Sequence, residues 1–381
     1  MNKQIALSAL LLFAAVLALP GVGAAAGSEV APGARPGDEP AAASGERVSG
    51  PETNQTTEEL LFLTWPDYVD PTLVREFEHE QQVRLRFEYF DSDDARDRLM
   101  AHTDGKGFDL LVVDNTAVAG YDRRGWIAPI VANAVPNLRH IDPGLDRAYA
   151  DTSGLAVPYF WGTLGIAYRT DLVPHPPRSW MDLLRPDAAL SGRIMMIADS
   201  FDLVGMSLKA LGHSMNSNDP DALAQAAALL AEQKPAVHRY GTLSLGADSE
   251  LLTGEVIAAM AYSGDAATLM DQDAAIAYVV PREGGAIWVD YLAINARGRR
   301  SLAAAFIDFL NRPEVSARNA RHLSYATPNR AAKTLLPAEF LQNPLIYPDA
   351  ETLAHSEHYA ALTPDALRRR VQVYSAIVYG D

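Results

Sequence analysis

Short apolar segments alternate with helix-forming segments from residue 60 onward, and this alternation constrains the fold more than any other feature. Residues 60–63 are entirely apolar, 83–89 alternate apolar with polar side chains, and 109–113 are mainly apolar. Between them, Asp70-Pro71 is typical of a helix start, and a second helix is predicted over 92–101. The order strand, helix, strand, helix, strand predicts an α/β unit with a parallel sheet covered on both faces.

The same alternation resumes after residue 190. Helices are predicted over 203–211, 220–233, 302–310 and 365–379, with another ending at 251–254. Strands are predicted over 192–198, 256–262, 275–280 and 288–295. No fixed-period repeat is visible, so we expect two α/β units joined by crossing segments.

Residues 1–26 have the pattern of a Sec-type signal peptide. Lys3 precedes an apolar run over 5–19, which ends at the helix-breaking Pro20 and a stretch of small residues. The run is shorter than the about 20 residues that a membrane-spanning helix needs, which favours cleavage over a retained anchor. Residues 27–58 are rich in Ala, Gly, Pro, Glu and Ser, and predict a disordered linker.

The cysteine count and the charge narrow the functional classes. The chain has no Cys, which excludes disulfides and a lipid anchor attached through Cys. It carries 48 acidic against 32 basic residues, a formal net charge of −16 at pH 7. This balance disfavours nucleic acid and anionic membranes as partners and would attract a cationic ligand. Solubility alone explains an acidic surface equally well, so the charge permits such a ligand without identifying it.

The known enzyme motifs are absent. The sequence contains no Gly-x-Ser-x-Gly elbow, no phosphate-binding loop and no dinucleotide-binding glycine pattern. His355 and His358 could contribute to a metal site, but they lack a third ligand nearby in the sequence, so a solvated turn is the better interpretation. Clustered tyrosines can bind ferric iron, yet most of the 15 here are expected in the core or lining a cleft. We therefore expect no catalytic residues, no metal and no cofactor.

Aromatic residues lie beside carboxylates at four strand ends. The four segments are 65–68 (WPDY), 199–202 (DSFD), 262–265 (YSGD) and 288–290 (WVD). In α/β sheets, ligands bind beyond the carboxyl ends of the strands. Carboxylates pair with ammonium groups, and aromatic faces cover methylenes and attract cations. Each pair alone could be a helix cap or turn, but together they predict a site for a cationic or polar small ligand.

Seven segments carry a family resemblance that extends from Leu60 to the C-terminus. They are 64–69 (TWPDYV), 108–112 (FDLLV), 157–162 (VPYFWG), 281–285 (PREGG), 288–290 (WVD), 325–329 (YATPN) and 347–351 (YPDAE). In these segments the chain resembles the bacterial periplasmic spermidine/putrescine-binding proteins of polyamine ABC transporters, which include sensory relatives. The resemblance implies a two-lobed α/β periplasmic binding protein (type II, cluster D-like) with hinge crossings and a ligand cleft between the lobes.

The resemblance also implies where the lobes divide. Crossings are expected near 163–169, near Trp288 and around 333–339. Lobe 1 is then 59–165 with 289–333, and lobe 2 is 169–287 with 339–381. Closure about these hinges would trap the ligand.

The resemblance assigns roles to particular residues. Trp65 and Trp288 correspond to walls that stack on the polyamine. Asp67, Tyr68 and Tyr325 correspond to polar groups at one end of it. Asp199 and Asp202 correspond to acids that hold an amine, and Asp290 to the acid of a central nitrogen. Asp265 corresponds to an Asp of putrescine-preferring members.

The sequence departs from the family pattern at several of these positions. Pro66 replaces a hydroxyl residue, Asp114 and Thr116 replace Ser and Tyr, Tyr262 replaces Trp, and Tyr359 replaces Gln. The site therefore has more acid and less indole. We hypothesise that Asp114 serves an additional or differently spaced nitrogen; the alternative is a turn-stabilising Asp that points away.

The resemblance leaves two functions open. The first is capture of a polyamine in the periplasm, as a monomer, for delivery to an ABC permease. The second is sensing, in which the occupied protein reports to a membrane cyclic-di-GMP signalling receptor.

Overall fold

The computed structural model describes residues 57–90, 92–146, 154–360 and 362–380. The predicted signal peptide lies outside these residues, and so does the predicted linker except for its last two positions. The second of these, Glu58, already belongs to the first strand, so the folded part begins slightly earlier than expected.

The first predicted α/β unit is confirmed. Its helices begin at residues whose side chains cap them: Asp70 accepts from Thr72 N at 2.7 Å, and Ser92 accepts from Ala95 N at 3.2 Å. The central strand, β1, pairs in parallel with β2 on one side and β3 on the other. The elements are β1 (Glu58–Thr64), α1 (Pro71–Gln81), β2 (Val83–Tyr89), α2 (Asp93–His102), β3 (Leu110–Asp114) and α3 (Asn115–Arg123).

The second unit has the same plan. Its central strand, β6, pairs in parallel with β7 and β8. The helix predicted over 203–211 begins earlier, because Asp199 accepts hydrogen bonds from Phe201 N and Asp202 N at 2.7 and 2.9 Å. The elements are β6 (Ile194–Met196), α6 (Ser200–Ala210), α7 (Pro220–Gln233), β7 (Val237–Tyr240), α8 (Glu250–Thr253), β8 (Ala258–Tyr262), α9 (Ser263–Gln272) and α15 (Pro364–Val378).

Two long strands, β5 (Ala156–Arg169) and β10 (Ala286–Asn295), connect the units. They pair antiparallel with each other, β10 pairs antiparallel with β3, and β5 with β8. The expectation of a purely parallel sheet is therefore correct within each unit and wrong for these strands. β5 was not predicted as a strand, since it is buried almost throughout and shows no apolar–polar alternation.

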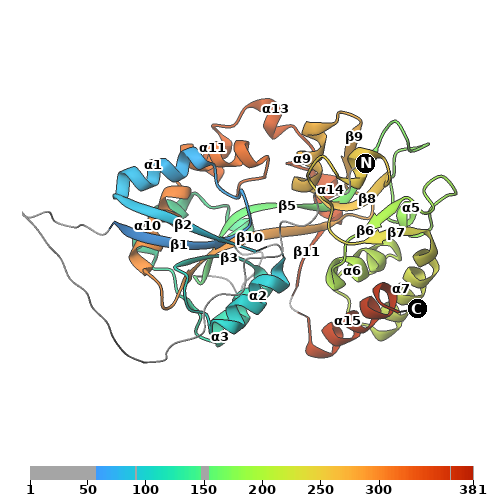
Figure 1. Cartoon of the computed structure of the whole chain (residues 1–381), viewed down its shortest axis with the longest axis horizontal. Helices are drawn as coiled ribbons and strands as arrows, with labels where there is room; N and C mark the ends of the chain where they lie inside the picture. The colour runs from blue at the N-terminus through green and yellow to red at the C-terminus, as the bar shows by residue number, and fades with distance from the viewer. Residues whose placement is uncertain (1–56, 91, 147–153, 361, 381) are drawn as a thin grey trace, which may run out of the picture. The chain divides into compact units, whose positions relative to one another are not determined.

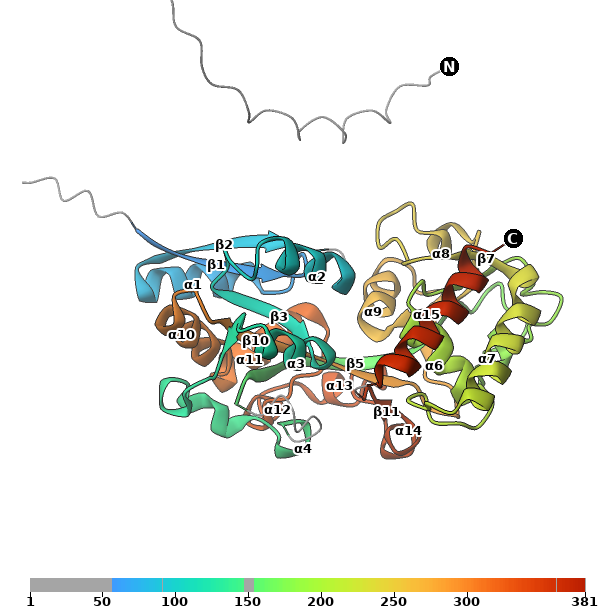
Figure 2. The ribbon, with the colours of Figure 1, turned by 90° about the horizontal axis from the view of Figure 1, so that it is seen from below.

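The partners of β5 change along its length. Residues 156–163 pair with β10, whereas 164–168 pair with β8. Figures 1 and 2 show β5 and β10 running between two groups of helices, α1, α10 and α11 on one side and α6, α7 and α15 on the other. Within the described residues the strand order is β2-β1-β3-β10-β5-β8-β6-β7.

The remaining elements are mostly short. They are β4 (Ile127–Ala128), α4 (Pro143–Asp146), α5 (Met181–Leu184), β9 (Ile276–Val279), α10 (Arg300–Leu310), α11 (Pro313–Leu323), α12 (Arg330–Lys333), α13 (Ala338–Leu341), α14 (Ala350–His355), β11 (Glu357–His358) and the 3₁₀ turns Ala132–Ala134, Pro136–His140 and Lys234–Ala236. β9 and the helices α10 and α15 agree with the predicted ranges to within two residues.

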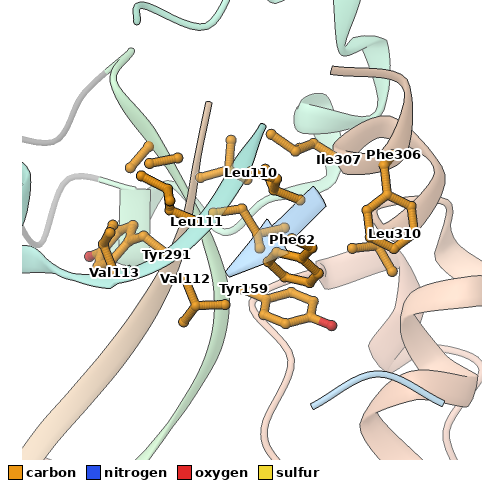
Figure 3. Packing of buried hydrophobic residues seen from close by; sticks show 14 of the residues in the cluster. Phe62, Leu110, Leu111, Val112, Val113, Tyr159, Tyr291, Phe306, Ile307 and Leu310 are labelled. Carbon is orange, nitrogen blue, oxygen red and sulfur yellow. The ribbon is translucent and has the colours of Figure 1, made fainter. Parts of the chain in front are cut away.

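The buried apolar residues form two large clusters. One joins β1, β3 and the first half of β5 to α10. Figure 3 shows this packing, with Phe62 of β1 and Leu110 of β3 facing Phe306 and Leu310 of α10. The other joins the second half of β5 and β6 to α6 and α7. The chain thus has a separate core on each side of the point where β5 changes partners.

Candidate functional site

The predicted site residues lie mostly where strands end and helices begin. Asp114 ends β3, Asp199 follows β6, and Tyr262 ends β8, each directly before a helix. Asp290 in β10 is the cross-strand partner of Asp114 in an antiparallel pair. The fold therefore brings acids from distant parts of the sequence to the same edge.

Asp290 is a largely enclosed carboxylate with no cation in hydrogen-bond contact among the described residues, although the charge of Arg96 acts on it from farther away. Its Oδ2 accepts a hydrogen bond from the Tyr68 hydroxyl at 2.6 Å. Burial raises the pKa of Asp290 to about 6, helped by the charge of Asp114 and opposed by hydrogen bonds from Tyr68 and Trp65. Such a group is stabilised in its charged form by any cation that approaches.

Aromatic rings enclose this carboxylate. The Tyr325 ring lies edge-on to Tyr68 and Trp288, with centroids 5.7 and 5.4 Å apart. A methyl group at Gly264 would come within 1.8 Å of the Tyr325 ring, so only glycine permits this approach. Trp288 and Tyr325 remain partly exposed, and each offers some ring surface to solvent.

Asp265 stands in the first turn of α9, beside Tyr325. Among the described residues its carboxylate forms neither a hydrogen bond nor an ion pair, although it is partly enclosed. Burial raises the pKa of Asp265 to about 6. Its charge in turn raises the pKa values of Tyr325 and Tyr278, after the larger effect of their own burial.

Asp202 holds the predicted tyrosines together. It is 1% exposed, and its two oxygens accept hydrogen bonds from the hydroxyls of Tyr262 and Tyr359, both at 2.5 Å. Burial and the charge of Asp199 raise the pKa of Asp202 to about 7, opposed by the two tyrosines and by Arg370. Asp202 is therefore internal, whereas Asp199 caps α6 and is exposed.

Asp114 is bound within the protein. Its Oδ1 accepts from Thr116 N at 2.7 Å, from Ala117 N at 3.1 Å and from the Thr116 hydroxyl, and so caps α3. Its Oδ2 accepts from Arg96 Nη2 at 2.6 Å. Despite burial, the Arg96 charge and these hydrogen bonds hold the pKa of Asp114 below its usual value. Asp114 thus caps a helix, as its alternative role requires, and its charge is paired with that of Arg96; whether it also contacts a ligand nitrogen stays a prediction.

Two predicted residues, Asp67 and Thr116, are exposed and lie at the margin of the site, where Thr116 contacts only Asp114 among the predicted residues. Asp67 is exposed in a left-handed turn (φ 52°), where its charge acts on Tyr89. Thr116 is exposed and donates its hydroxyl to the cap of α3. The structure brings together the other eleven, which we call the acidic–aromatic cluster: Trp65, Tyr68, Asp114, Asp199, Asp202, Tyr262, Asp265, Trp288, Asp290, Tyr325 and Tyr359.

Sequence reasoning missed three residues beside this cluster. Asp93 interacts with Asp114, Asp290 and Tyr262, so it links the two halves of the cluster. Burial raises the pKa of Asp93 despite its ion pair with Arg96. Tyr278 feels the charge of Asp265. The third missed residue is Arg96, and the acidic run 91–94 followed by Arg96 is a sequence signal that could have drawn attention to both Asp93 and Arg96.

The described residues assemble no group of three His, Asp or Glu side chains suited to a metal ion. His355 Nδ1 lies 2.9 Å from the carbonyl oxygen of Glu351 in its own helix. Surface hollows of about 480 and 420 Å³ lie elsewhere, one beside Glu59 and Arg86 and the other beside Ile130 and Leu138. The acidic–aromatic cluster therefore remains the best candidate for recognising a ligand.

Comparison with known proteins identifies the family of the chain. The family model described as bacterial extracellular solute-binding protein matches residues 72–348. The chain belongs to this family. It is 31% identical to the norspermidine sensor of Vibrio cholerae, over 84% of this chain and 89% of that protein. It is also 31% identical to the spermidine/putrescine-binding periplasmic protein of Escherichia coli, over 78% and 85%.

Solved structures show that this similarity includes the fold. The spermidine/putrescine ABC transporter substrate-binding protein of Streptococcus pneumoniae superposes with a TM-score of 0.75 at 27% identity, covering 84% of this chain and 98% of that one. The fold is thus that of the α/β, two-lobed periplasmic binding proteins, as the sequence predicted. Among the described residues, no helix is long and apolar enough to cross a membrane.

Proposed function

We propose that the protein binds a linear polyamine of the putrescine, spermidine and norspermidine class at the acidic–aromatic cluster. The observation that carries this proposal is the pair Asp265 and Asp290. Both are enclosed carboxylates with raised pKa values, they lack an ion-pair partner within the described residues, and they lie beside the rings of Trp288 and Tyr325. Ammonium groups supply the missing charge, and the rings cover the methylenes between them.

The names of similar proteins support this ligand class. Besides the norspermidine sensor and the spermidine/putrescine-binding protein, a putrescine/agmatine-binding protein of Pseudomonas aeruginosa is 29% identical over 83% of this chain. All of these names refer to aliphatic ligands with nitrogen atoms near their ends.

The ligand would be enclosed by movement of two lobes. We assign lobe 1 to 59–165 with 289–333 and lobe 2 to 169–287 with 339–381. The separate cores and the change of partners at Thr163 and Leu164 in β5 support a boundary within this strand, whereas Phe340, Ile346 and Tyr347, assigned to lobe 2, pack against the first core. Hinge closure about the connecting strands would bring Asp290 and Asp265 to the same ligand.

Export and delivery complete the main proposal. The predicted signal peptide would direct the chain to the periplasm, as the names of its periplasmic relatives suggest. There the monomer would carry polyamine to the permease of an ABC transporter. The alternative, a sensor that reports to a membrane signalling receptor, is favoured by the similarity to the norspermidine sensor. Co-purification from membranes with a permease or with a receptor distinguishes the two.

A thermal-shift screen tests the binding function. Putrescine, norspermidine, spermidine and spermine are each added to the purified mature protein, and at least one is expected to raise the melting temperature in proportion to the logarithm of its concentration. Asp265→Asn should reduce the shift. Asp271→Asn, which removes an exposed acid from the same helix, should not. Equal shifts for both variants, or none for the wild type, would contradict the proposal.

A further inference from the structure

Arg96 is a buried cation at the border of the acidic–aromatic cluster. Arg96 is 1% exposed, and its guanidinium contacts three carboxylates. Nη1 donates to Asp93 at 2.5 Å, Nη2 to Asp114 at 2.6 Å, and Nε and Nη2 both donate to Asp97, at 3.1 and 2.9 Å. The Tyr121 hydroxyl also donates to Asp97, at 2.6 Å. A guanidinium keeps its charge at any physiological pH, so this positive charge is permanent and fixed in place.

The contacts of Asp114 show what this cation does. One oxygen is used by the helix cap and the other pairs with Arg96, so the charge of the carboxylate is already compensated within the protein. Asn115, the next residue, donates its side-chain amide to the carbonyl oxygen of Tyr359 at 3.0 Å. The end of β3 is thus tied down on both sides.

Arg96 pairs with acids that lie close to Asp290. Asp114 is the cross-strand partner of Asp290, and the charges of both Asp114 and Arg96 act on Asp290. Asp93 lies close enough for its charge to act on Tyr262. Without the guanidinium, the carboxylates of Asp93 and Asp114 would extend the row of acids beyond Asp290 and attract another ammonium group.

We propose that Arg96 sets the ligand selectivity of this protein by acting as a tethered cation that fills one ammonium position of the cluster. This inference rests on the proposed polyamine function. It follows that a ligand whose nitrogens reach only Asp290 and the acids of the second unit binds without opposition. A longer polyamine, whose additional nitrogen would fall at Asp114, finds that carboxylate already paired with the guanidinium and gains less from it.

The test is isothermal titration calorimetry of putrescine and spermine with the mature wild-type protein and with Arg96→Gln. Glutamine keeps much of the side-chain length and its hydrogen bonding but removes the charge. We expect the ratio of the spermine to the putrescine dissociation constant to fall by at least about tenfold in Arg96→Gln, because a vacated position accepts one more ammonium group. The matched control is Arg98→Gln, which removes an exposed arginine from the same helix and should leave the ratio unchanged.

A double variant and a single variant test whether Asp114 contacts the ligand itself or serves only as the partner of Arg96. Arg96→Gln with Asp114→Asn removes both charges and should return the ratio towards the wild-type value. Asp114→Asn alone keeps a capping side chain and should weaken both ligands by the same small factor, under about threefold. A selective loss of spermine in Asp114→Asn of more than about tenfold would mean that Asp114 binds ligand directly, and would overturn the inference even if Arg96→Gln does not fold.

The outcomes distinguish this inference from the function on which it rests. A wild type that gives no binding heat with any polyamine contradicts the proposed function. If the wild type binds polyamine and Arg96→Gln changes the ratio of the spermine to the putrescine dissociation constant by less than about twofold, only the role of Arg96 is contradicted.

Discussion

Asp114 and Asp290 are cross-strand partners in one antiparallel pair, yet they have opposite surroundings. Asp114 caps a helix and pairs with Arg96, and its pKa is held low. Asp290 accepts hydrogen bonds from the hydroxyl of Tyr68 and the indole of Trp65, has no ion pair among the described residues, and its pKa is raised to about 6. The carboxylate of Asp114 is ion-paired within the protein, whereas that of Asp290 has no ion-pair partner among the described residues.

The difference separates structural acids from binding acids. A carboxylate that is already neutralised stabilises the fold, whereas an enclosed one without a cation destabilises the empty protein and gains most when a cation arrives. By this criterion Asp265, which forms neither a hydrogen bond nor an ion pair among the described residues, resembles Asp290. The predictions below test it, from the largest expected effect to the smallest.

Replacing Asp290 should damage binding most. In Asp290→Asn the affinity for the preferred polyamine should fall at least about a hundredfold, since the amide leaves a buried ammonium group unpaired. Calorimetry on the wild type, Asp290→Asn and Asp114→Asn checks this. If the two variants lose affinity equally, the distinction between the two acids is wrong.

For the stability of the empty protein the order of the two acids should be reversed: the loss of Asp114 should destabilise it, and the loss of the Asp290 charge should not. Asp114→Ala removes a helix cap and one partner of a buried guanidinium, so its free energy of unfolding should fall by about 2–4 kcal/mol. Asp290→Asn should raise that of the empty protein at pH 8 by about 1–2 kcal/mol, because an enclosed charge is removed and partial exposure screens the rest. Urea unfolding without ligand measures both. A loss of stability in both variants would show that Asp290 is structural as well.

Binding should weaken at low pH. Asp265 and Asp290 have pKa values near 6 in the empty protein, and an ammonium ligand binds their ionised forms. Polyamine affinity should therefore be highest above pH 7 and fall by about tenfold or more by pH 5.

The stability of the empty protein should show the reverse trend, because the contributions of Asp265 and Asp290 make it less stable as the pH rises. Their folded pKa values lie above the unfolded value, so their destabilising contribution is absent below about pH 4 and fully present above about pH 7. Melting temperatures recorded with and without ligand across this range should diverge as the pH rises, and parallel curves would contradict the assignment.

The Tyr68 hydroxyl should have the smallest effect. Tyr68→Phe removes the donor that lowers the pKa of Asp290, so more of this acid is protonated at pH 7. Affinity should fall by about threefold at pH 7 and less at pH 8.5, since the higher pH ionises Asp290 in either protein. A loss that does not depend on pH would indicate that Tyr68 contacts the ligand itself.

Much of the fold could be predicted because local signals agreed with the tertiary structure. Asp70-Pro71 and Asp219-Pro220 each cap a helix and begin it, and the alternation over 83–89 is a strand. β5 was missed because burial on both faces removes the alternation that reveals a strand, and because its two halves belong to different cores. The antiparallel direction of β10 depends on contacts with β3, about 180 residues away, which no local pattern encodes.

The candidate site was predictable in its residue types and less so in their roles. Aromatic–acid pairs at strand ends indicated a cationic ligand, and the fold brings most of them together. The sequence could not show that Asp114 is neutralised, because Arg96 lies on a different element and reaches it only in three dimensions. Asp67 follows Trp65 closely in sequence, but its left-handed backbone turns it towards Tyr89.

Calorimetric titration of the mature wild-type protein with norspermidine, spermidine and putrescine at pH 6 tests the central claim most directly. Run in two buffers with different heats of ionisation, it measures affinity and proton exchange together. At least one polyamine should bind in a 1:1 complex and release protons, as its ammonium groups ionise Asp265 and Asp290. Absence of binding, or binding with no proton release, would contradict the claim that these two unpaired acids are the binding groups.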